Sequence, residues 1–387
     1  MSESRRQRRG PSLRARRRRR LFAVLASAAA MVLLVVGAFV WVPTLMQSPT
    51  PAAASAPASP VATPEPDPEF TPRSDAELLL ARVDDPNVCA VSFAGDGISD
   101  TPVLETQGTL YAHLPSPARE GAVFAGWYTT PADAAAFTIT QRVNGSRAVA
   151  CTDRQITLTG AWKSPEENVA EKAKVPILMY HQFTTKPEGE SGWLRGNYAF
   201  IGDFDAQMNH IATGGFYLPT WRELGDFIDG KLYLPNHSVI ITDDDADQTW
   251  FDLAAPVVDK YKLLTTSFMI TAYRQDPAPN IYVLRRSHTH DMHKAGANGK
   301  GEMVNLPADQ IAADLETSAS VLGVKEVIAY PFGHFNDTSK KGLAQAGFEM
   351  ARTIEPGYVS IGTDKLALPV QRINYGMGVD ALIGMIG

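Results

Sequence analysis

Residues 238–250 have the sequence SVIITDDDADQTW, in which three adjacent aspartates follow a short apolar run. The β-branched run Val239–Ile241 is typical of a buried strand, so we predict that a strand ends at this point. Neighbouring carboxylates repel one another, and a chain that places three of them together has to neutralise part of their charge. A solvated turn, a calcium loop and a catalytic site are the three explanations to separate.

The calcium explanation can be tested on the sequence itself. Asp243, Asp245 and Asp247 alternate in the way of the first ligands of an EF-hand loop. That loop also requires Gly at its sixth position and Glu at its twelfth. This chain has Gln248 and Ala254 at those two positions, which excludes an EF-hand.

Strand-like and helix-like patterns alternate on both sides of this stretch. We expect strands at 175–180, 239–241, 266–270 and 327–329, and helices at 204–212, 224–228, 253–261 and 307–322. This alternation predicts an α/β fold with a largely parallel sheet, and a domain at 174–387 is long enough for a distorted (β/α) barrel. Chemistry in such barrels occurs at the carboxyl ends of the strands, which is where the aspartates lie.

A histidine cluster offers partners for the aspartates. Residues 286–294 have the sequence RSHTHDMHK, so three of the chain's eight histidines, His288, His290 and His293, lie within six residues. Imidazole nitrogen and carboxylate oxygen are common ligands of transition metals, and two His with one Asp leave positions open for water and substrate. Spacing alone does not select two of these three histidines.

Two further segments carry polar groups at predicted strand ends. LMYHQF places His181 after the first strand of the barrel, and AYPFGHFND, residues 329–337, places a rigid Pro-Phe-Gly turn after another. Together the four segments resemble the polysaccharide deacetylases, the NodB-homology carbohydrate esterases of family four. The resemblance extends over about residues 175–375.

The resemblance implies roles for particular residues. Asp245, His288 and His293 hold one divalent metal ion, and Asp244 is the general base. The spacing of the two histidines resembles the branch that deacetylates poly-N-acetylglucosamine, in which the catalytic acid comes from the first strand and is here His181. Zn²⁺ suits this ligand set, and Ni, Co and Fe are alternatives.

Other positions follow from the same resemblance. Arg372 corresponds to an arginine that orients the base. The Pro-Phe-Gly turn corresponds to a family motif that walls the substrate groove, and we expect a backbone N–H there, that of Tyr330, to stabilise the oxyanion. The residues of that turn are Tyr330, Pro331, Phe332 and Gly333.

Three positions complete the predicted site. Asp243 replaces an apolar residue of the family and is expected to face solvent, and His290 is expected to be structural. Ala246 stands where the family has Gly, which is unfavourable if that turn needs a positive φ. On this interpretation a metal ion and a proton neutralise part of the crowded charge of the aspartates.

The implied activity is hydrolysis of N-acetyl groups on a wall or capsule glycan, either poly-N-acetylglucosamine or peptidoglycan, to free amine and acetate. An O-acetyl polysaccharide esterase and a glycan-binding surface protein without turnover are the alternatives. Trp193, Phe335 and Tyr375 are candidates for the wall of a sugar groove, although core or loop positions are more usual for such side chains.

The N-terminal region predicts a membrane location. Residues 1–20 carry ten Arg and one Glu, and residues 21–43 carry no charged side chain. This pattern predicts a single-pass signal anchor with the tail in the cytoplasm and the rest outside the cell, or a secreted protein if the anchor is cleaved. The formal net charge is −6 despite the basic tail, so the acidic remainder argues against a nucleic-acid partner.

Residues 48–73 are rich in Pro and Ala and predict an extended linker. Residues 75–163 contain short strand-like runs at 91–93, 109–111, 123–128 and 156–162. LPSPAREGAVFAGWYT, which begins at Leu114, resembles the internalin-type B repeat (the Listeria–Bacteroides repeat), and this implies a small β-grasp-like module. Cys89 and Cys151 are the only cysteines, and the predicted oxidising compartment favours a disulfide between them.

Overall fold

The computed structural model describes residues 73–273 and 280–387. The predicted basic tail, membrane span and linker, apart from residue 73, lie outside the described residues. Within the described part of the chain, no helix is both long enough and apolar enough to cross a bilayer.

The N-terminal module contains one five-stranded sheet with the strand order β2-β1-β5-β3-β4. The central strands β1 and β5 are parallel, and the other neighbours are antiparallel. Its elements are α2 (Asp75–Leu80), β1 (Val88–Ala94), β2 (Val103–Thr106), β3 (Val123–Tyr128), α3 (Pro131–Ala136), η1 (Ile139–Gln141), β4 (Arg142–Val143), β5 (Gln155–Lys163) and α4 (Pro165–Ala170). Whether this sheet belongs to the internalin-type repeat stays a prediction.

The structure joins Cys89 and Cys151 in a disulfide, as expected from the sequence. Trp127 is buried in the core of the module, and its indole N–H donates to the carbonyl of Pro115 at 2.8 Å. The strand predicted at 109–111 is wrong, because Leu110 makes only an isolated bridge there.

The second part of the chain is a closed barrel of seven strands in the order β10-β11-β12-β13-β14-β6-β9. Every pair of neighbours is parallel, which confirms the predicted α/β barrel. Its strands are β6 (Ile177–Tyr180), β9 (Ile240–Asp245), β10 (Thr265–Met269), β11 (Val283–Ser287), β12 (Val327–Ala329), β13 (Met350–Pro356) and β14 (Leu368–Arg372). A separate pair, β7 (Gln182–Thr184) and β8 (Tyr198–Phe200), follows β6.

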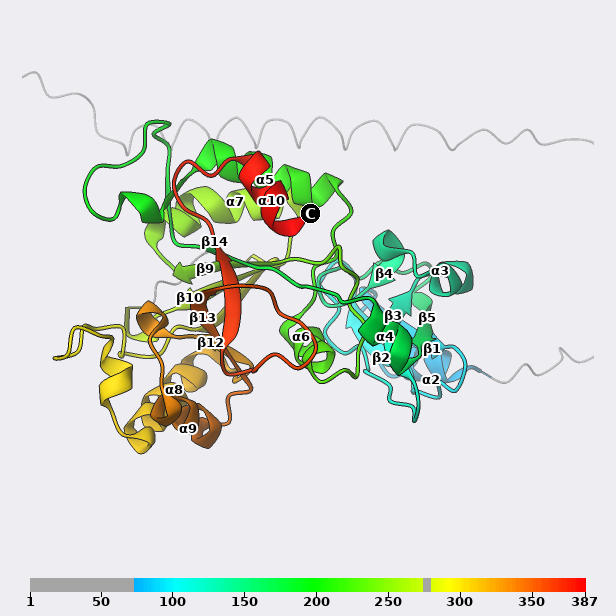
Figure 1. Ribbon diagram of the computed structural model, residues 1–387. Helices are drawn as coiled ribbons and strands as arrows, with labels where there is room; N and C mark the ends of the chain where they lie inside the picture. Colours follow the sequence, from blue (N-terminus) through cyan, green and yellow to red (C-terminus); the bar gives the residue numbers. More distant parts are fainter. Residues whose placement is uncertain (1–72, 274–279) are drawn as a thin grey trace, which may run out of the picture. The chain divides into compact units, whose positions relative to one another are not determined.

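Helices cover the outside of the barrel in two groups (Figure 1). One group contains α5, α7 and α10, and the other contains α8 and α9. The helices are α5 (Ile201–Thr213), α6 (Trp221–Ile228), α7 (Ala255–Tyr261), α8 (Ala308–Leu322), α9 (Asp337–Ala346) and α10 (Val379–Ile386), with a π-helical turn η3 (Trp250–Ala254) before α7 and 3-10 turns η2 (Arg195–Asn197), η4 (Thr271–Tyr273), η5 (Glu302–Asn305) and η6 (Pro331–Gly333). The barrel is distorted, since the segment from β13 to β14 contains no helix.

The parallel arrangement decides where the predicted site residues meet. Because all seven strands run in one direction, their carboxyl ends lie at the same rim of the barrel. Asp245 is the last residue of β9, and His181 and His288 directly follow β6 and β11. Residues far apart in the sequence are thereby brought to one end of the molecule.

Candidate metal centre

The three adjacent aspartates have three different environments. Side chains alternate between the two faces of a strand, so Asp243 and Asp244 point to opposite faces of β9. Asp245 and Ala246 both have positive φ, of 73° and 51°, and this ends the regular strand. The chain therefore separates charges that appear crowded in the sequence.

Asp245, His288 and His293 are brought together as a group of potential metal ligands. One atom from each lies within 4.8 Å of the others. The Nε2 atoms of His288 and His293 are each 3.4 Å from Oδ1 of Asp245. His288 is fixed from behind, because its Nδ1 lies 2.8 Å from the carbonyl oxygen of Ala329, which leaves Nε2 free to face Asp245.

These residues fit a divalent cation. Oδ1 of Asp245 is buried and has no hydrogen-bond partner among the described residues. A buried carboxylate oxygen without a partner is costly, and a cation shared with the two imidazoles would satisfy it. Separations near 3.4 Å between donor atoms are those of ligands about 2.1 Å from one ion.

The charges of the group also suit metal binding. Burial raises the pKa of Asp245, but His288 and His293 together lower it to well below the usual range, so the carboxylate is ionised. Burial, followed by the nearby His288, lowers the pKa of His293, which favours the neutral imidazole. Burial also acts on His288, yet Asp245 and Asp244 raise its pKa, so metal binding there would displace a proton.

Asp244 forms a buried ion pair with Arg352 of β13. Burial raises the pKa of Asp244, but Arg352 and then His181 oppose this effect, and the pKa lies below its ordinary value. Nε2 of His181 is 3.7 Å from Oδ2 of Asp244. Burial is the main cause of a lowered pKa at His181, and the two carboxylates nearby only partly offset it.

The contact predicted for Arg372 is made by Arg352 instead. The guanidinium of Arg372 donates to Asn197 at 2.7 Å and to Asn374 at 3.0 Å. Arg372 is the last residue of β14, and its side chain reaches Asn197 and Asn374 rather than the base. Arg352 was missed in the sequence because nothing local marks it as a partner of Asp244.

Asp243 does not face solvent as expected. It is fully buried, and its Oδ2 accepts a hydrogen bond of 3.1 Å from the hydroxyl of Ser267. Burial is the main cause that raises its pKa well above the usual value, followed by the charges of Asp244 and Asp245. A proton therefore neutralises this carboxyl group, and Arg352 neutralises its neighbour.

The turn after β12 differs from the expected groove wall. Tyr330 is buried, its hydroxyl donates to the carbonyl of Leu366, and its N–H donates to the carbonyl of Arg352 at 3.0 Å. That N–H belongs to the ladder between β12 and β13, so it is not available as an oxyanion donor. Pro331 and Gly333 are buried as well.

Phe332 is the one residue of this turn that reaches the surface. Its side chain is 41% exposed, and its ring stacks on the ring of His293 at a centroid distance of 4.4 Å. Gly333 has a φ of 70°, and a Cβ there would lie 2.3 Å from Ile354, so only glycine fits. The Pro-Phe-Gly sequence thus presents an aromatic ring beside a candidate metal ligand.

Gln182 and His290 complete the surroundings of the centre. Nε2 of Gln182 makes a long hydrogen bond of 3.4 Å to Oδ2 of Asp245, a contact that the sequence did not indicate. His290 lies outside the group of three, and its Nδ1 is 3.0 Å from the hydroxyl of Thr271. The structure therefore selects His288 and His293 among the three clustered histidines.

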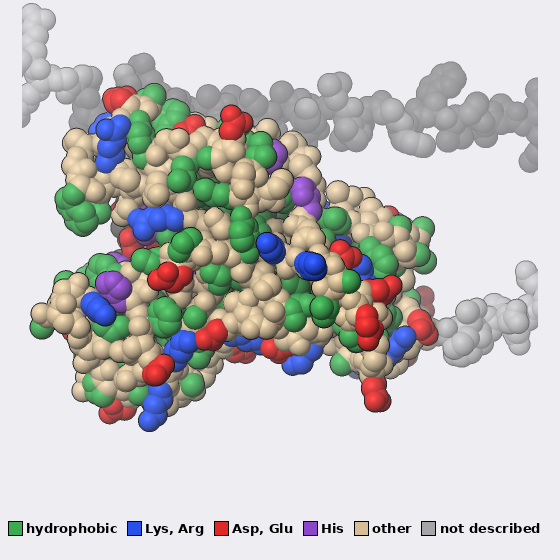
Figure 2. Space-filling model, viewed as in Figure 1, with side chains coloured by type: hydrophobic (Ala, Val, Ile, Leu, Met, Phe, Trp, Pro, Cys, Tyr) green, Lys and Arg blue, Asp and Glu red, His purple; other side chains and the backbone are tan. Residues whose placement is uncertain are grey.

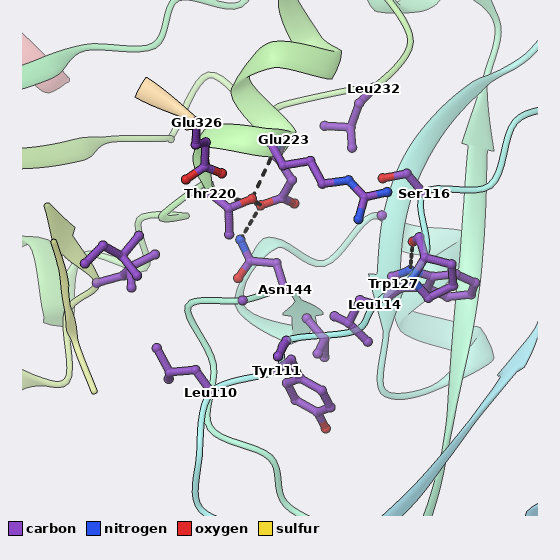
Figure 3. A pocket seen from close by; sticks show the side chains of 18 of the residues that line it. Leu110, Tyr111, Leu114, Ser116, Trp127, Asn144, Thr220, Glu223, Leu232 and Glu326 are labelled. Atoms are coloured by element: carbon purple, nitrogen blue, oxygen red, sulfur yellow. Dashed lines mark hydrogen bonds between the residues drawn. The ribbon is translucent and has the colours of Figure 1, made fainter. Parts of the chain in front are cut away.

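A separate cavity of about 540 Å³ lies away from these residues (Figure 3). Its walls include Leu110, Tyr111 and Trp127 of the module and Thr220 and Glu223 at the start of α6. Glu223 accepts hydrogen bonds from Thr220 and from Asn144 across the cavity. None of the three potential ligands lines this cavity, so it is not the candidate site.

Charged side chains of both signs are spread over the face seen in Figure 2. Lys and Arg side chains are interspersed there with Asp and Glu, without a continuous basic patch over the described residues.

Residues 231–351 match the family described as polysaccharide deacetylase. They include Asp244, Asp245, His288 and His293, so the stretch that is similar to this family contains the candidate centre. Arg352 lies directly after the matched range, whereas His181 lies well before it.

Curated relatives include poly-beta-1,6-N-acetyl-D-glucosamine N-deacetylases. The protein of Staphylococcus aureus (strain MRSA252) is 28% identical over 187 residues, which cover 43% of this chain and 64% of the relative. The protein of Staphylococcus epidermidis is 28% identical over 188 residues, which cover 43% of this chain and 65% of the relative. The chain thus spans just under two thirds of the length of these relatives.

Solved structures that are similar to this chain were also found, and two of them follow. The Streptococcus pyogenes deacetylase PplD in complex with acetate has a TM-score of 0.48 and 22% identity, and covers 56% of this chain and 99% of its own. IcaB from Ammonifex degensii has a TM-score of 0.46 and 20% identity, and covers 55% of this chain and 97% of its own.

Proposed function

We propose that this chain is a metal-dependent polysaccharide N-deacetylase, which hydrolyses N-acetyl groups of a poly-N-acetylglucosamine-like glycan to free amine and acetate. The observation that carries the proposal is the convergence of Asp245, His288 and His293 beside the ionised, unligated carboxylate of Asp244. The family match at 231–351 and the staphylococcal relatives support the same activity.

The proposed roles follow from the positions and charges of the side chains. A divalent cation bound by Asp245, His288 and His293 would polarise the acetyl carbonyl and lower the pKa of a water molecule. Asp244 is kept ionised by Arg352 and is therefore able to take a proton from the attacking water.

The second proton transfer is assigned to His181. As the C–N bond of the acetamide breaks, the departing amine needs a proton, and His181 can supply it after it receives the proton that Asp244 took from the attacking water. His181 lies 3.7 Å from Asp244, so the base and the acid border the same small space at the barrel rim. The products are the free amino sugar and acetic acid, which ionises to acetate. The proton that Asp244 takes from water ends on the amine by way of His181, so both side chains return to their starting protonation states.

The identity of the metal and of the glycan belong to the proposal. Zn²⁺ suits one carboxylate and two imidazoles, and Ni, Co and Fe are the alternatives. Poly-N-acetylglucosamine is favoured over peptidoglycan because the curated relatives carry that substrate in their names. The membrane anchor at 21–43 and the linker at 48–73 would place the catalytic domain outside the cell.

Two substitutions separate metal binding from catalysis. Asp245→Ala should abolish both metal binding and acetate release, because it removes the shared ligand. Asp244→Asn should retain the metal and lose acetate release by at least about a hundredfold, since a neutral amide cannot accept the proton. Both are compared with Asp309→Asn, a solvent-exposed change on α8.

The assay measures acetate released from N-acetylglucosamine oligomers by the full-length protein, with and without a chelator. Near-normal turnover in Asp244→Asn contradicts the assignment of the base. Chelator-insensitive turnover contradicts the metal-dependent mechanism. Full metal binding without any acetate release in the wild type favours the alternative of a glycan-binding protein, and release only from O-acetylated polymers favours an esterase.

A further inference from the structure

Helix α8 touches the loop that carries the two candidate metal-binding histidines. Asp314 and Ser318 are four residues apart on this helix and therefore share one face. Both side chains contact backbone or side-chain atoms between Ser287 and Asp291. The roles proposed above for the metal ligands and for the base do not use either of them.

The carboxylate of Asp314 makes two hydrogen bonds to this loop. Its Oδ1 accepts the N–H of His290 at 2.7 Å, and its Oδ2 accepts the N–H of Asp291 at 2.9 Å. These two peptide groups lie between His288 and His293, so Asp314 holds the backbone that connects the two histidines. A half-buried carboxylate with two N–H donors is a strong, charge-assisted contact.

The remaining contacts show why this loop needs to be held. Thr289 has a φ of 71°, which is unfavourable for a β-branched residue. Its N–H donates to the hydroxyl of Ser287 at 3.0 Å, and that hydroxyl lies 2.7 Å from the hydroxyl of Ser318. The surrounding contacts therefore impose a backbone conformation that the local sequence disfavours.

We propose that Asp314 is a positioning residue for the metal centre, which sets the relative orientation of His288 and His293 before the metal binds. The inference rests on the proposed function, because the centre it serves is the metal site proposed there. Both Nε2 atoms already lie 3.4 Å from Asp245, so the ligands require little reorganisation. Preorganisation of this kind lowers the entropy cost of metal binding. Without the Asp314 contacts the loop would have to be ordered when the metal binds, and metal binding would be weaker.

The test is a Co²⁺ titration of the full-length protein, with Co²⁺ alone as the probe and its visible absorption as the signal. Asp314→Asn offers one acceptor oxygen and turns an NH₂ group toward the second N–H, so it should weaken Co²⁺ binding by on the order of tenfold. Its visible band should also change, because the band reports ligand geometry. Asp314→Glu keeps two acceptor oxygens and should lie between the wild type and Asp314→Asn.

The control is Asp309→Asn on the same helix, whose side chain is exposed and which should behave as the wild type. An Asp314→Asn protein that is less stable to heat but keeps the wild-type affinity and band overturns the proposal, since Asp314 would then serve the fold alone. If Asp314→Asn does not fold, the same comparison is made with Asp314→Glu. A wild-type protein that binds no Co²⁺ contradicts the proposed function itself, and the inference with it.

Discussion

The guanidinium of Arg352 forms an ion pair with the carboxylate of Asp244, 108 residues earlier in the chain. The side chains of both residues are almost completely buried, at 1% and 4% exposure. Burial alone would favour a protonated Asp244, and Arg352 is the main group that keeps it ionised. The ability of Asp244 to accept a proton near neutral pH therefore depends on a residue on another strand.

Arg352→Met tests this dependence. Removal of one partner of a buried pair leaves an uncompensated charge, and we expect a loss of about 3–5 kcal/mol in the free energy of unfolding. The pKa of Asp244 should rise, so the acid limb of the pH profile of kcat/KM should move to higher pH. Urea unfolding and the pH profile of acetate release measure the two effects.

The matched control is Arg372→Met. Its guanidinium binds the neutral side chains of Asn197 and Asn374, so the acid limb should stay where it is in the wild type. If the acid limb shifts in Arg372→Met but not in Arg352→Met, then Arg372 is the residue that keeps Asp244 ionised, and the assignment to Arg352 is contradicted.

Asp243 gives a prediction about stability and pH. Its pKa is raised well above the ordinary value of 3.8, so the folded protein holds this proton more tightly than the unfolded chain. The stability that the proton contributes is complete below pH 3.8 and falls as the pH rises through the native pKa. Asp243→Asn, which is neutral at every pH, should remove this fall. Thermal unfolding of the wild type and of Asp243→Asn from pH 5 to 9 measures this loss of stability. If the Tm of both proteins depends on pH in the same way, the prediction is contradicted.

Ala246 occupies a position where glycine is favoured. Its φ is 51°, and the left-handed region costs a residue with a Cβ about 1 kcal/mol. Ala246→Gly should therefore stabilise the protein by several tenths of a kcal/mol after the greater entropy of the unfolded chain is subtracted. Ala313→Gly, on the exposed face of α8, should instead destabilise it by about 1 kcal/mol. If both changes lower the Tm equally, the positive φ of Ala246 does not destabilise the protein, and the prediction is contradicted.

Trp193 is 91% exposed on the loop between β7 and β8, and β7 directly follows His181 in the chain. A large aromatic ring with so little packing is a candidate for contact with a glycan chain. Trp193→Ala should raise KM severalfold for oligomers and leave kcat and Tm unchanged, while Trp193→Phe should keep most of the affinity. An unchanged KM for oligomers in the alanine variant would exclude Trp193 from the substrate path.

Local patterns were sufficient to predict the α/β barrel and to place the aspartates and the histidine cluster at strand ends, whereas the choice of His288 and His293 as ligands came from the resemblance to the deacetylase family. Apolar runs followed by Asp245 or His288 mark strand ends, and parallel strands bring such ends to one rim. The place of Asp243 also follows from alternation, because it lies on the same face of β9 as the buried Ile241. That signal was present in the sequence and was overlooked.

Other contacts depend on strand register, which the sequence does not display. Arg352 in MARTIEP carries no local mark of a partner 108 residues away. The N–H of Tyr330 is unavailable only because β12 pairs with β13 at Arg352. Asp314 lies on a helix whose contact with the histidine loop is likewise set by tertiary packing.

The most direct measurement is an anomalous-scattering map, at the zinc absorption edge, from crystals of the full-length protein grown with Zn²⁺. We predict one strong peak bonded to Oδ1 of Asp245 and to the Nε2 atoms of His288 and His293, with Asp244 not coordinated. A protein that releases acetate while this position is empty, or while zinc is held by other side chains, would contradict the account.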